Sequence, residues 1–205
     1  MNHSIQHAIE TRMSVNHFQP DRPLEDGVIE SLISQATRAP SAYNLQNWRF
    51  IAVRSPDAKC RLRSAAYGQQ KIVDASVAFI ICGTLEAYSQ LASALEPSVD
   101  AQIMEPRIVD AWVAQATATH EGNPVLQRDE AVRSASLAAM TLMLAAQGMG
   151  LGSCAMSGFD AQQVSRAFDL AATELPVMIV TVGHAADDNW PQKPRRALTD
   201  VLSIV

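Results

Sequence analysis

Apolar positions recur along most of the chain at spacings typical of helices and short strands. Helical spacing predicts helices over residues 4–10, 24–38, 56–66, 128–148 and 160–170. Short apolar runs predict buried strands over residues 50–54, 77–82, 151–156 and 176–183. Residues 86–120 are helix-like but contain Pro97 and Pro106, so we expect a helical excursion broken into two or more pieces. Because helices and strands mix without strict βα alternation, the pattern predicts a single α+β domain over residues 1–205.

The helix predicted over residues 128–148 is apolar on nearly every side, so we expect it to be buried on most sides. After it comes Gly150-Leu151-Gly152-Ser153-Cys154-Ala155, which matches the dinucleotide fingerprint G-x-G-x-x-A. That fingerprint requires the glycines to follow a strand and to open a helix. The order is reversed here, so we interpret the glycines as the end of the helix.

Composition narrows the classes of partner. A net charge of -5 provides no global basic field, so we expect neither nucleic acid nor a membrane as a partner. The apolar stretches are too short and too interrupted to span a bilayer. The three cysteines form no CxxC pair, which disfavours a zinc site or a disulfide framework and favours a reducing, cytoplasmic setting. The five histidines show no metal-ligand spacing, and we expect most of them on the surface.

A polar loop is predicted over residues 39–48, between a helix and a strand. Pro40 ends the helix because it removes a backbone donor and disfavours helical geometry at the preceding residue. Ser41, Asn44 and Gln46 then offer hydrogen-bond donors and acceptors on short side chains. The loop suits a flat heterocycle with hydrogen-bonding edges, and an ordinary helix-to-strand turn is an equally good interpretation of these residues alone.

Four further short features carry candidate chemistry. In Arg12-Met13-Ser14, a guanidinium can hold a phosphate through two hydrogen bonds while the hydroxyl adds a third. In Lys193-Pro194-Arg195, the proline favours an extended chain that projects both cations to one side. Gly68-Gln69-Gln70-Lys71 precedes the strand at 77–82, and Gly158-Phe159-Asp160 follows the strand at 151–156. Each feature alone is also typical of a solvated surface.

Taken together and in this order, the features resemble the nitroreductase family of flavin enzymes, over about residues 5–205. The resemblance rests on Arg12-x-Ser14, Ala39-Pro40-Ser41-x-x-Asn44-x-Gln46-x-Trp48, the lead from Lys71 to Ser76, Gly150-Leu151-Gly152, Gly158-Phe159-Asp160 and Lys193-x-Arg195. It implies a nitroreductase-like fold with a central, mostly antiparallel sheet flanked by helices, in an intertwined homodimer. It also implies FMN as the cofactor and NAD(P)H as a transient electron donor.

The same resemblance implies which residues contact FMN. The positions that match within one subunit are Arg12, Ser14, Gln69, Lys71, Ala155, Met156, Ser157, Gly158, Lys193 and Arg195. The three cations near the two ends of the chain match the phosphate site, and Ser14 lies near the phosphate and the ribityl chain. Gln69 and Lys71 match the pyrimidine edge of the ring, and residues 155–158 match the strand end that covers one ring face and offers N–H groups near N5 and O4.

The polar loop matches the segment that the partner subunit lays against the flavin. Its matching residues are Pro40, Ser41, Asn44 and Gln46. Met13 and Asn16 are further cofactor-binding candidates that depart from the family pattern, because relatives often carry basic or imidazole groups at these two positions. The loss of positive charge predicts weaker FMN retention or a lower flavin potential.

The excursion at residues 86–120 is where relatives vary their substrate pocket. Trp112 is a candidate to stack over the flavin or its substrate, and it is at least as well interpreted as packing the excursion onto the core. Tyr43 is the second candidate for the substrate pocket, because it lies within the flavin-facing loop.

The resemblance therefore implies an oxidoreductase that uses NAD(P)H to reduce nitroaromatics, quinones or a related small acceptor, by ping-pong hydride transfer through flavin N5. We find no Ser-His-Asp or Cys-His set, so no side-chain nucleophile is expected. A reductive dehalogenase or an enoate-type flavin reductase is an alternative, and so is a non-catalytic flavin-binding protein.

Overall fold

A computed structural model, which describes residues 5–205, contains one four-stranded sheet in the order β1-β2-β4-β3. The strands are β1 (Trp48–Val53), β2 (Val77–Thr84), β3 (Gly152–Met156) and β4 (Glu174–Gly183). All three neighbouring pairs are antiparallel, which confirms the predicted sheet. The helices are α1 (Ile5–Thr11), α2 (Asp26–Ala36), α3 (Pro56–Ala65), α4 (Lys71–Asp74), α5 (Leu91–Asp100), α6 (Pro106–His120), α7 (Pro124–Gly148) and α8 (Ala161–Ala167). Residue 4 of the first predicted helix lies outside the described residues.

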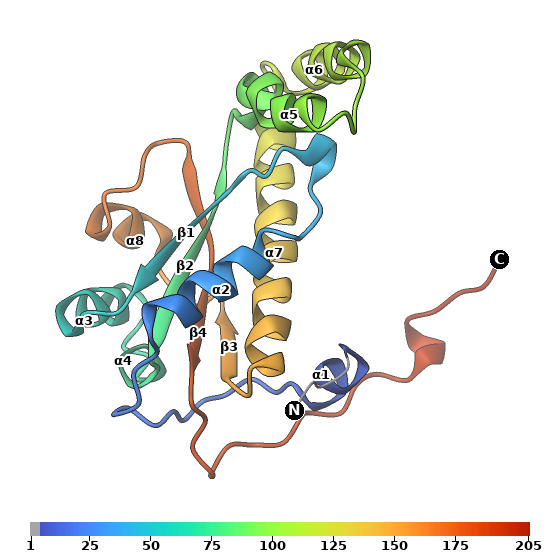
Figure 1. Cartoon of the computed structure of the whole chain (residues 1–205). Helices are drawn as coiled ribbons and strands as arrows, with labels where there is room; N and C mark the ends of the chain where they lie inside the picture. The colour runs from blue at the N-terminus through green and yellow to red at the C-terminus, as the bar shows by residue number, and fades with distance from the viewer. Residues whose placement is uncertain (1–4) are drawn as a thin grey trace.

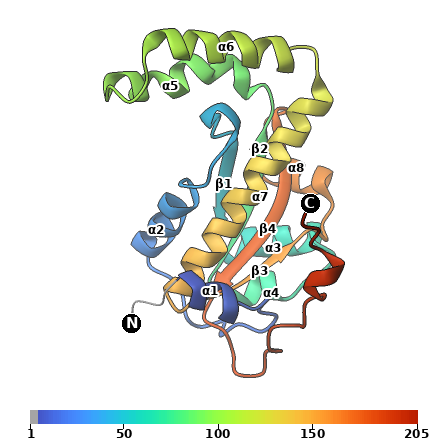
Figure 2. The ribbon, with the colours of Figure 1, turned by 90° about the vertical axis from the view of Figure 1, so that its right-hand side faces the viewer.

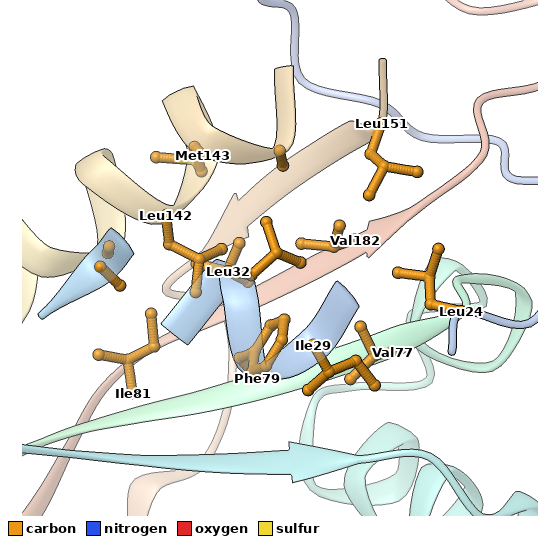
Figure 3. Packing of buried hydrophobic residues seen from close by; sticks show 14 of the residues in the cluster. Leu24, Ile29, Leu32, Val77, Phe79, Ile81, Leu142, Met143, Leu151 and Val182 are labelled. Atoms are coloured by element: carbon orange, nitrogen blue, oxygen red, sulfur yellow. The ribbon is translucent and has the colours of Figure 1, made fainter. Parts of the chain in front are cut away.

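Helices cover both faces of the sheet, with α2 and α7 on one face and α3, α4 and α8 on the other (Figures 1 and 2). Successive side chains of a strand point to opposite faces of the sheet, and in β2 the side chains on both faces are apolar. Phe79 packs with Leu32 of α2 and Leu142 of α7 (Figure 3), whereas Ile80 packs in the cluster beneath α3 and α8. This double burial explains why β2 reads in the sequence as an unbroken apolar run.

The glycines after α7 end the helix, as interpreted from the sequence. Gly150 has a φ of 73°, a left-handed conformation that favours glycine. Its N–H donates to Gln147 O at 3.0 Å, and Leu151 N–H donates to Ala146 O at 2.9 Å. These two bonds form a Schellman motif, which satisfies carbonyls at the helix end and turns the chain into β3.

The expectation that α7 is buried on most sides was wrong for one face of the helix. Leu137 is 44% exposed and Met140 is 38% exposed. Within one chain α7 packs inward on the sheet, and these side chains point away from that contact. The start of α7 also differs from the prediction, because Asn123 Oδ1 caps the helix by accepting from Leu126 N–H at 3.1 Å.

The helical excursion comprises α5 and α6, which project together beyond one end of the sheet (Figure 2). Pro106 begins α6, where its missing N–H costs nothing, so the expected break is confirmed there. The expected break at Pro97 was wrong, because Pro97 lies inside α5. Burial of Leu91 and Leu95 in a shared apolar cluster holds the helix despite one absent backbone donor.

Within residues 5–205, no helix is both long and apolar enough to cross a membrane. The same residues contain no group of three or more His, Cys, Asp or Glu side chains that could hold a metal ion.

Candidate functional site

The two ends of the chain meet beside β3. Residues 12–18 run along this edge strand, where Ser14 forms a parallel bridge with Ser153 and Val15 N–H donates to Ser153 O at 3.0 Å. Gly152 permits this approach, because a Cβ there would lie 2.6 Å from Val15 Cγ2. The segment after β4 meets the same stretch, where Ala185 forms an antiparallel bridge with Phe18. The sheet edge therefore brings residues 12–18 and 184–195 together (Figure 1).

A cationic hollow of about 60 Å³ lies between these two segments. Its lining includes Arg12, Met13, Ser14, Trp190, Lys193 and Arg195. No acidic residue lines it, and within residues 5–205 none of the three cations forms an ion pair with a carboxylate. Three converging and unneutralised cations repel one another, so this arrangement suits a bound anion.

A second hollow of about 380 Å³ adjoins the first. Its lining includes Asn16, Gln70, Lys71, Asp188 and Trp190. Trp190 borders both hollows, and the Lys193 ammonium lies 5.1 Å from the centre of its ring, within the range of a cation–π contact. Together we call the two neighbouring hollows the trough; the three cations line one of them and Lys71 lines the other.

Lys71 is positioned by contacts from two directions. Its ammonium donates to Asn16 Oδ1 at 2.6 Å and lies 3.8 Å from Cys154 Sγ of β3. The four-residue helix α4, on which Lys71 lies, is supported from beneath by Lys59. The buried Lys59 ammonium donates to Val73 O at 3.2 Å and to Ala75 O, and burial lowers its pKa from the ordinary value.

The end of β3 provides backbone groups beside Lys71. Met156 is buried, whereas Ser157 and Gly158 are exposed. Gln69 Nε2 donates to Gly158 O at 2.8 Å, which joins two separately predicted parts of the site. Among the described residues, no backbone acceptor pairs with the N–H groups of Ser157 and Gly158, so these donors are free to meet a ligand.

The polar loop lies apart from this trough within one chain, near α5 and α6 (Figures 1 and 2). Its backbone is strained, because Tyr43, Asn44 and Gln46 have φ values of 52°, 57° and 47°. Such values are tolerated by asparagine but unfavourable for tyrosine and glutamine. Ser41 Oγ accepts from Gln46 N–H at 2.9 Å and holds the loop in this shape. Strain maintained in this way is typical of functional segments.

The two substrate-pocket candidates touch each other. The rings of Tyr43 and Trp112 meet edge to face with centroids 5.9 Å apart. Both belong to the apolar cluster that packs α5 and α6 against Leu45, so Trp112 does pack the excursion onto its base. The nearby His120 is only 4% exposed, so it is an exception to the expectation that most histidines lie on the surface, whereas His7 and His17 are exposed.

Comparison with known proteins decides the family. A protein-family sequence model described as "Nitroreductase family" matches residues 9–184 of this chain. The chain belongs to the nitroreductase family. It is 32% identical over 177 residues to YodC of Bacillus subtilis, a protein named as an NAD(P)H nitroreductase. The matched region covers 86% of this chain and 87% of YodC.

Two further relatives extend the comparison. A nitroreductase-type protein of Exiguobacterium sibiricum 255-15, solved in complex with FMN, has the same fold, with a TM-score of 0.91. The two sequences are 24% identical, and the superposition covers 99% of this chain and 98% of that one. The CLA biosynthesis enone reductase of Lactiplantibacillus plantarum is 25% identical over 192 residues, covering 92% of this chain and 88% of the relative.

The donor set of this nitroreductase-family chain fits FMN. A phosphate dianion matches the three cations, and the free N–H groups at the end of β3 match the hydrogen-bonding edge of a flavin ring. Half of the residues predicted within one subunit line the two hollows: Arg12, Ser14, Lys71, Lys193 and Arg195. Gln69 and residues 155–158 line neither hollow, and the bond from Gln69 to Gly158 O joins those two parts to each other. The polar-loop residues Pro40, Ser41, Asn44 and Gln46 lie elsewhere in the chain.

Besides His17 and Gln70, sequence reasoning missed a continuous run of lining residues, positions 188–192. They stand in a proline-rich segment without helix or strand, so no periodicity marks them. The one signal was the presence of two amides and an indole directly before Lys193-Pro194-Arg195.

Proposed function

We propose that this nitroreductase-family enzyme binds FMN in the trough and uses NAD(P)H to reduce nitroaromatics, quinones or a related small acceptor. The observation that carries the proposal is the set of three cations, Arg12, Lys193 and Arg195, without carboxylate partners in the described chain, in the hollow beside the one that Lys71 lines. Bound FMN supplies a centre that accepts hydride and passes electrons to the acceptor in a ping-pong cycle.

The residues of the chain have distinct roles in this proposal. Arg12, Lys193 and Arg195 neutralise the phosphate, and Ser14 adds a hydroxyl donor. Lys71 places positive charge beside the pyrimidine edge, where it stabilises negative charge on the reduced ring. Ala155 and Met156 continue the strand toward the ring face, and the N–H groups of residues 157 and 158 orient the edge of the ring.

We further propose that the functional unit is a homodimer. Apolar side chains are exposed on three segments: Ile5 and Ile9 of α1, Leu137 and Met140 of α7, and Leu198, Val201 and Leu202 in the C-terminal tail. A monomer rarely exposes that much apolar surface on neighbouring elements, and a second copy of the chain would cover it. A partner would also supply the polar loop that the single chain keeps away from its own trough.

Mixed dimers test whether two subunits share a site. Arg12→Ala removes a phosphate cation, and Asn44→Ala removes a loop side chain of the other subunit. A dimer of one variant chain with the other contains one site with both defects and one site with none. We expect about half of its sites to regain wild-type FMN affinity. If the mixed dimer binds no better than the average of the two variant homodimers, the shared site is refuted.

A second candidate function is the reduction of enones. It is favoured by the L. plantarum enone reductase, which this chain matches over most of the length of both proteins. The trough chemistry is common to both candidates, so they differ in the acceptor and not in FMN binding. The reducing, cytoplasmic setting expected from the cysteines stays a prediction.

Steady-state kinetics with a panel of acceptors separates these functions. A nitroaromatic, a quinone and an enone are each varied against NADH and against NADPH. Parallel lines in double-reciprocal plots are expected for the preferred acceptor, because donor and acceptor use the flavin in turn. Bound FMN without turnover of any acceptor would instead identify a flavin-binding protein without catalytic activity.

A further inference from the structure

The segment that carries Lys193 and Arg195 is held in place by two amide side chains. Residues 189–197 form neither helix nor strand, so no backbone ladder fixes them. Asn189 and Gln192 instead bond the backbone of the opposite end of the chain. We propose that these two amides are positioning residues, which preset the cations of the phosphate site before FMN binds. The inference rests on the proposed function.

Asn189 uses both ends of its amide. Its Oδ1 accepts from the N–H groups of Asn16 and His17, at 2.7 Å and 3.0 Å. Its Nδ2 donates to His17 O at 2.7 Å and to Ala186 O at 2.9 Å. The side-chain oxygen therefore accepts two hydrogen bonds, and the amide nitrogen donates two, which uses both of its N–H groups. One residue thus clasps the C-terminal segment to residues 16–17.

Gln192 makes a second attachment three residues later. Its Nε2 donates to Arg12 O at 2.9 Å and to Ile9 O at 3.3 Å. Both carbonyls lie at the end of α1, where the helix leaves acceptors without intrahelical partners. Gln192 therefore ties the chain just before Lys193 to the backbone of the residue that provides the third cation.

Such attachments are needed because the three cations repel one another until an anion arrives. A segment without secondary structure would move away from Arg12 and would have to be ordered again during binding. Ordering the cations in advance removes that cost from the binding step, which raises affinity without adding a contact to the ligand.

The two amides differ in what else they hold. Asn189 fixes the backbone of Asn16, whose side chain accepts from Lys71 in the second hollow. Gln192 reaches only the cationic hollow. Loss of the Gln192 side chain should therefore lower the affinity for ligands that carry the phosphate, whereas loss of the Asn189 side chain should lower the affinity for any flavin.

The test compares FMN with riboflavin, which lacks the phosphate, in fluorescence titrations of the full chain freed of flavin. For Gln192→Ala we expect FMN affinity to fall by about five- to ten-fold with riboflavin affinity unchanged. For Asn189→Ala we expect both affinities to fall. Gln162→Ala, which removes an exposed amide on α8 that lines neither hollow, is the matched control and should change neither affinity.

Hydrogen exchange of the flavin-free chain provides a readout independent of binding. The N–H groups of Asn16 and His17 should exchange faster in Asn189→Ala than in the wild type, because their acceptor is removed. An equal loss of FMN and riboflavin affinity in Gln192→Ala, or unchanged exchange in Asn189→Ala, would overturn the positioning role. If the wild type binds neither flavin, the proposed function fails, and the exchange rates alone decide whether these amides hold the segment.

Discussion

Gly152→Ala should damage the contact on which the site is built. A Cβ at this position would lie 2.6 Å from Val15 Cγ2 and 3.2 Å from Ala185 Cβ. Val15 is 1% exposed and its branched side chain is stiff at χ1, so it cannot turn aside. Residues 12–18 must therefore move away from β3, and the segment that carries Ser14 and Asn16 moves with them.

The magnitude follows from two contributions. Overpacking of a tightly filled position costs about 1–3 kcal/mol of unfolding free energy. Stretching the bond from Val15 N–H to Ser153 O costs about 1 kcal/mol more. We therefore expect Gly152→Ala to lower the free energy of unfolding by about 2–4 kcal/mol.

Urea denaturation of single and double variants measures this cost. Val15→Ala removes the obstructing methyl groups, so the Gly152→Ala/Val15→Ala double variant should be more stable than the sum of the single effects predicts, by about 0.5–3 kcal/mol. Gly27→Ala is the control, because a Cβ there meets nothing within 4 Å and should stabilise α2 by about 0.5–1 kcal/mol. Wild-type stability of Gly152→Ala, or strict additivity in the cycle, would refute the reasoning.

Three further predictions concern charge, packing and pH. Asn16→Arg places a second cation where Lys71 now meets an amide oxygen, so the midpoint potential of bound FMN should rise; an unchanged potential counts against a role for position 16. Trp112→Ala should lower the free energy of unfolding by about 3 kcal/mol in urea titrations while FMN affinity stays the same, because Trp112 packs the excursion; the reverse pattern would assign it to the flavin instead. Hydrogen bonds from Arg49 lower the pKa of Glu174 below its usual 4.5, so the stability from this pair is present above that value and is lost as pH falls through the folded-state pKa. Glu174→Gln should therefore flatten the stability profile as the pH falls below 4.5, and an unchanged slope would contradict this assignment.

The strands could be predicted because burial on both faces leaves a strong local signal. β2 is an apolar run, since Phe79 and Ile80 each meet a different helical layer. Helix α4 has only four residues, which is less than two helical turns, so no apolar period marks it. Pro97 misled the prediction because packing of α5 outweighed the missing backbone donor.

The exposed face of α7 could not be distinguished from a core face in the sequence. Leu137 and Met140 have the composition of buried residues, and the hydrophobic pattern is the same whether a sheet or another subunit covers them. The residues of the trough were predicted only through the ordered resemblance, because each motif alone is typical of a surface. Asn189 was missed because its partners in Asn16 and His17 are more than 170 residues away along the chain.

The most direct test of the account is an anaerobic titration of the FMN-loaded protein with NADH and, separately, with NADPH. The account predicts that at least one nucleotide bleaches the flavin absorbance near 450 nm, by about one equivalent per bound FMN, and that a nitroaromatic or quinone restores it. Protein that cannot be loaded with FMN, or bound FMN that neither nucleotide reduces, would contradict it.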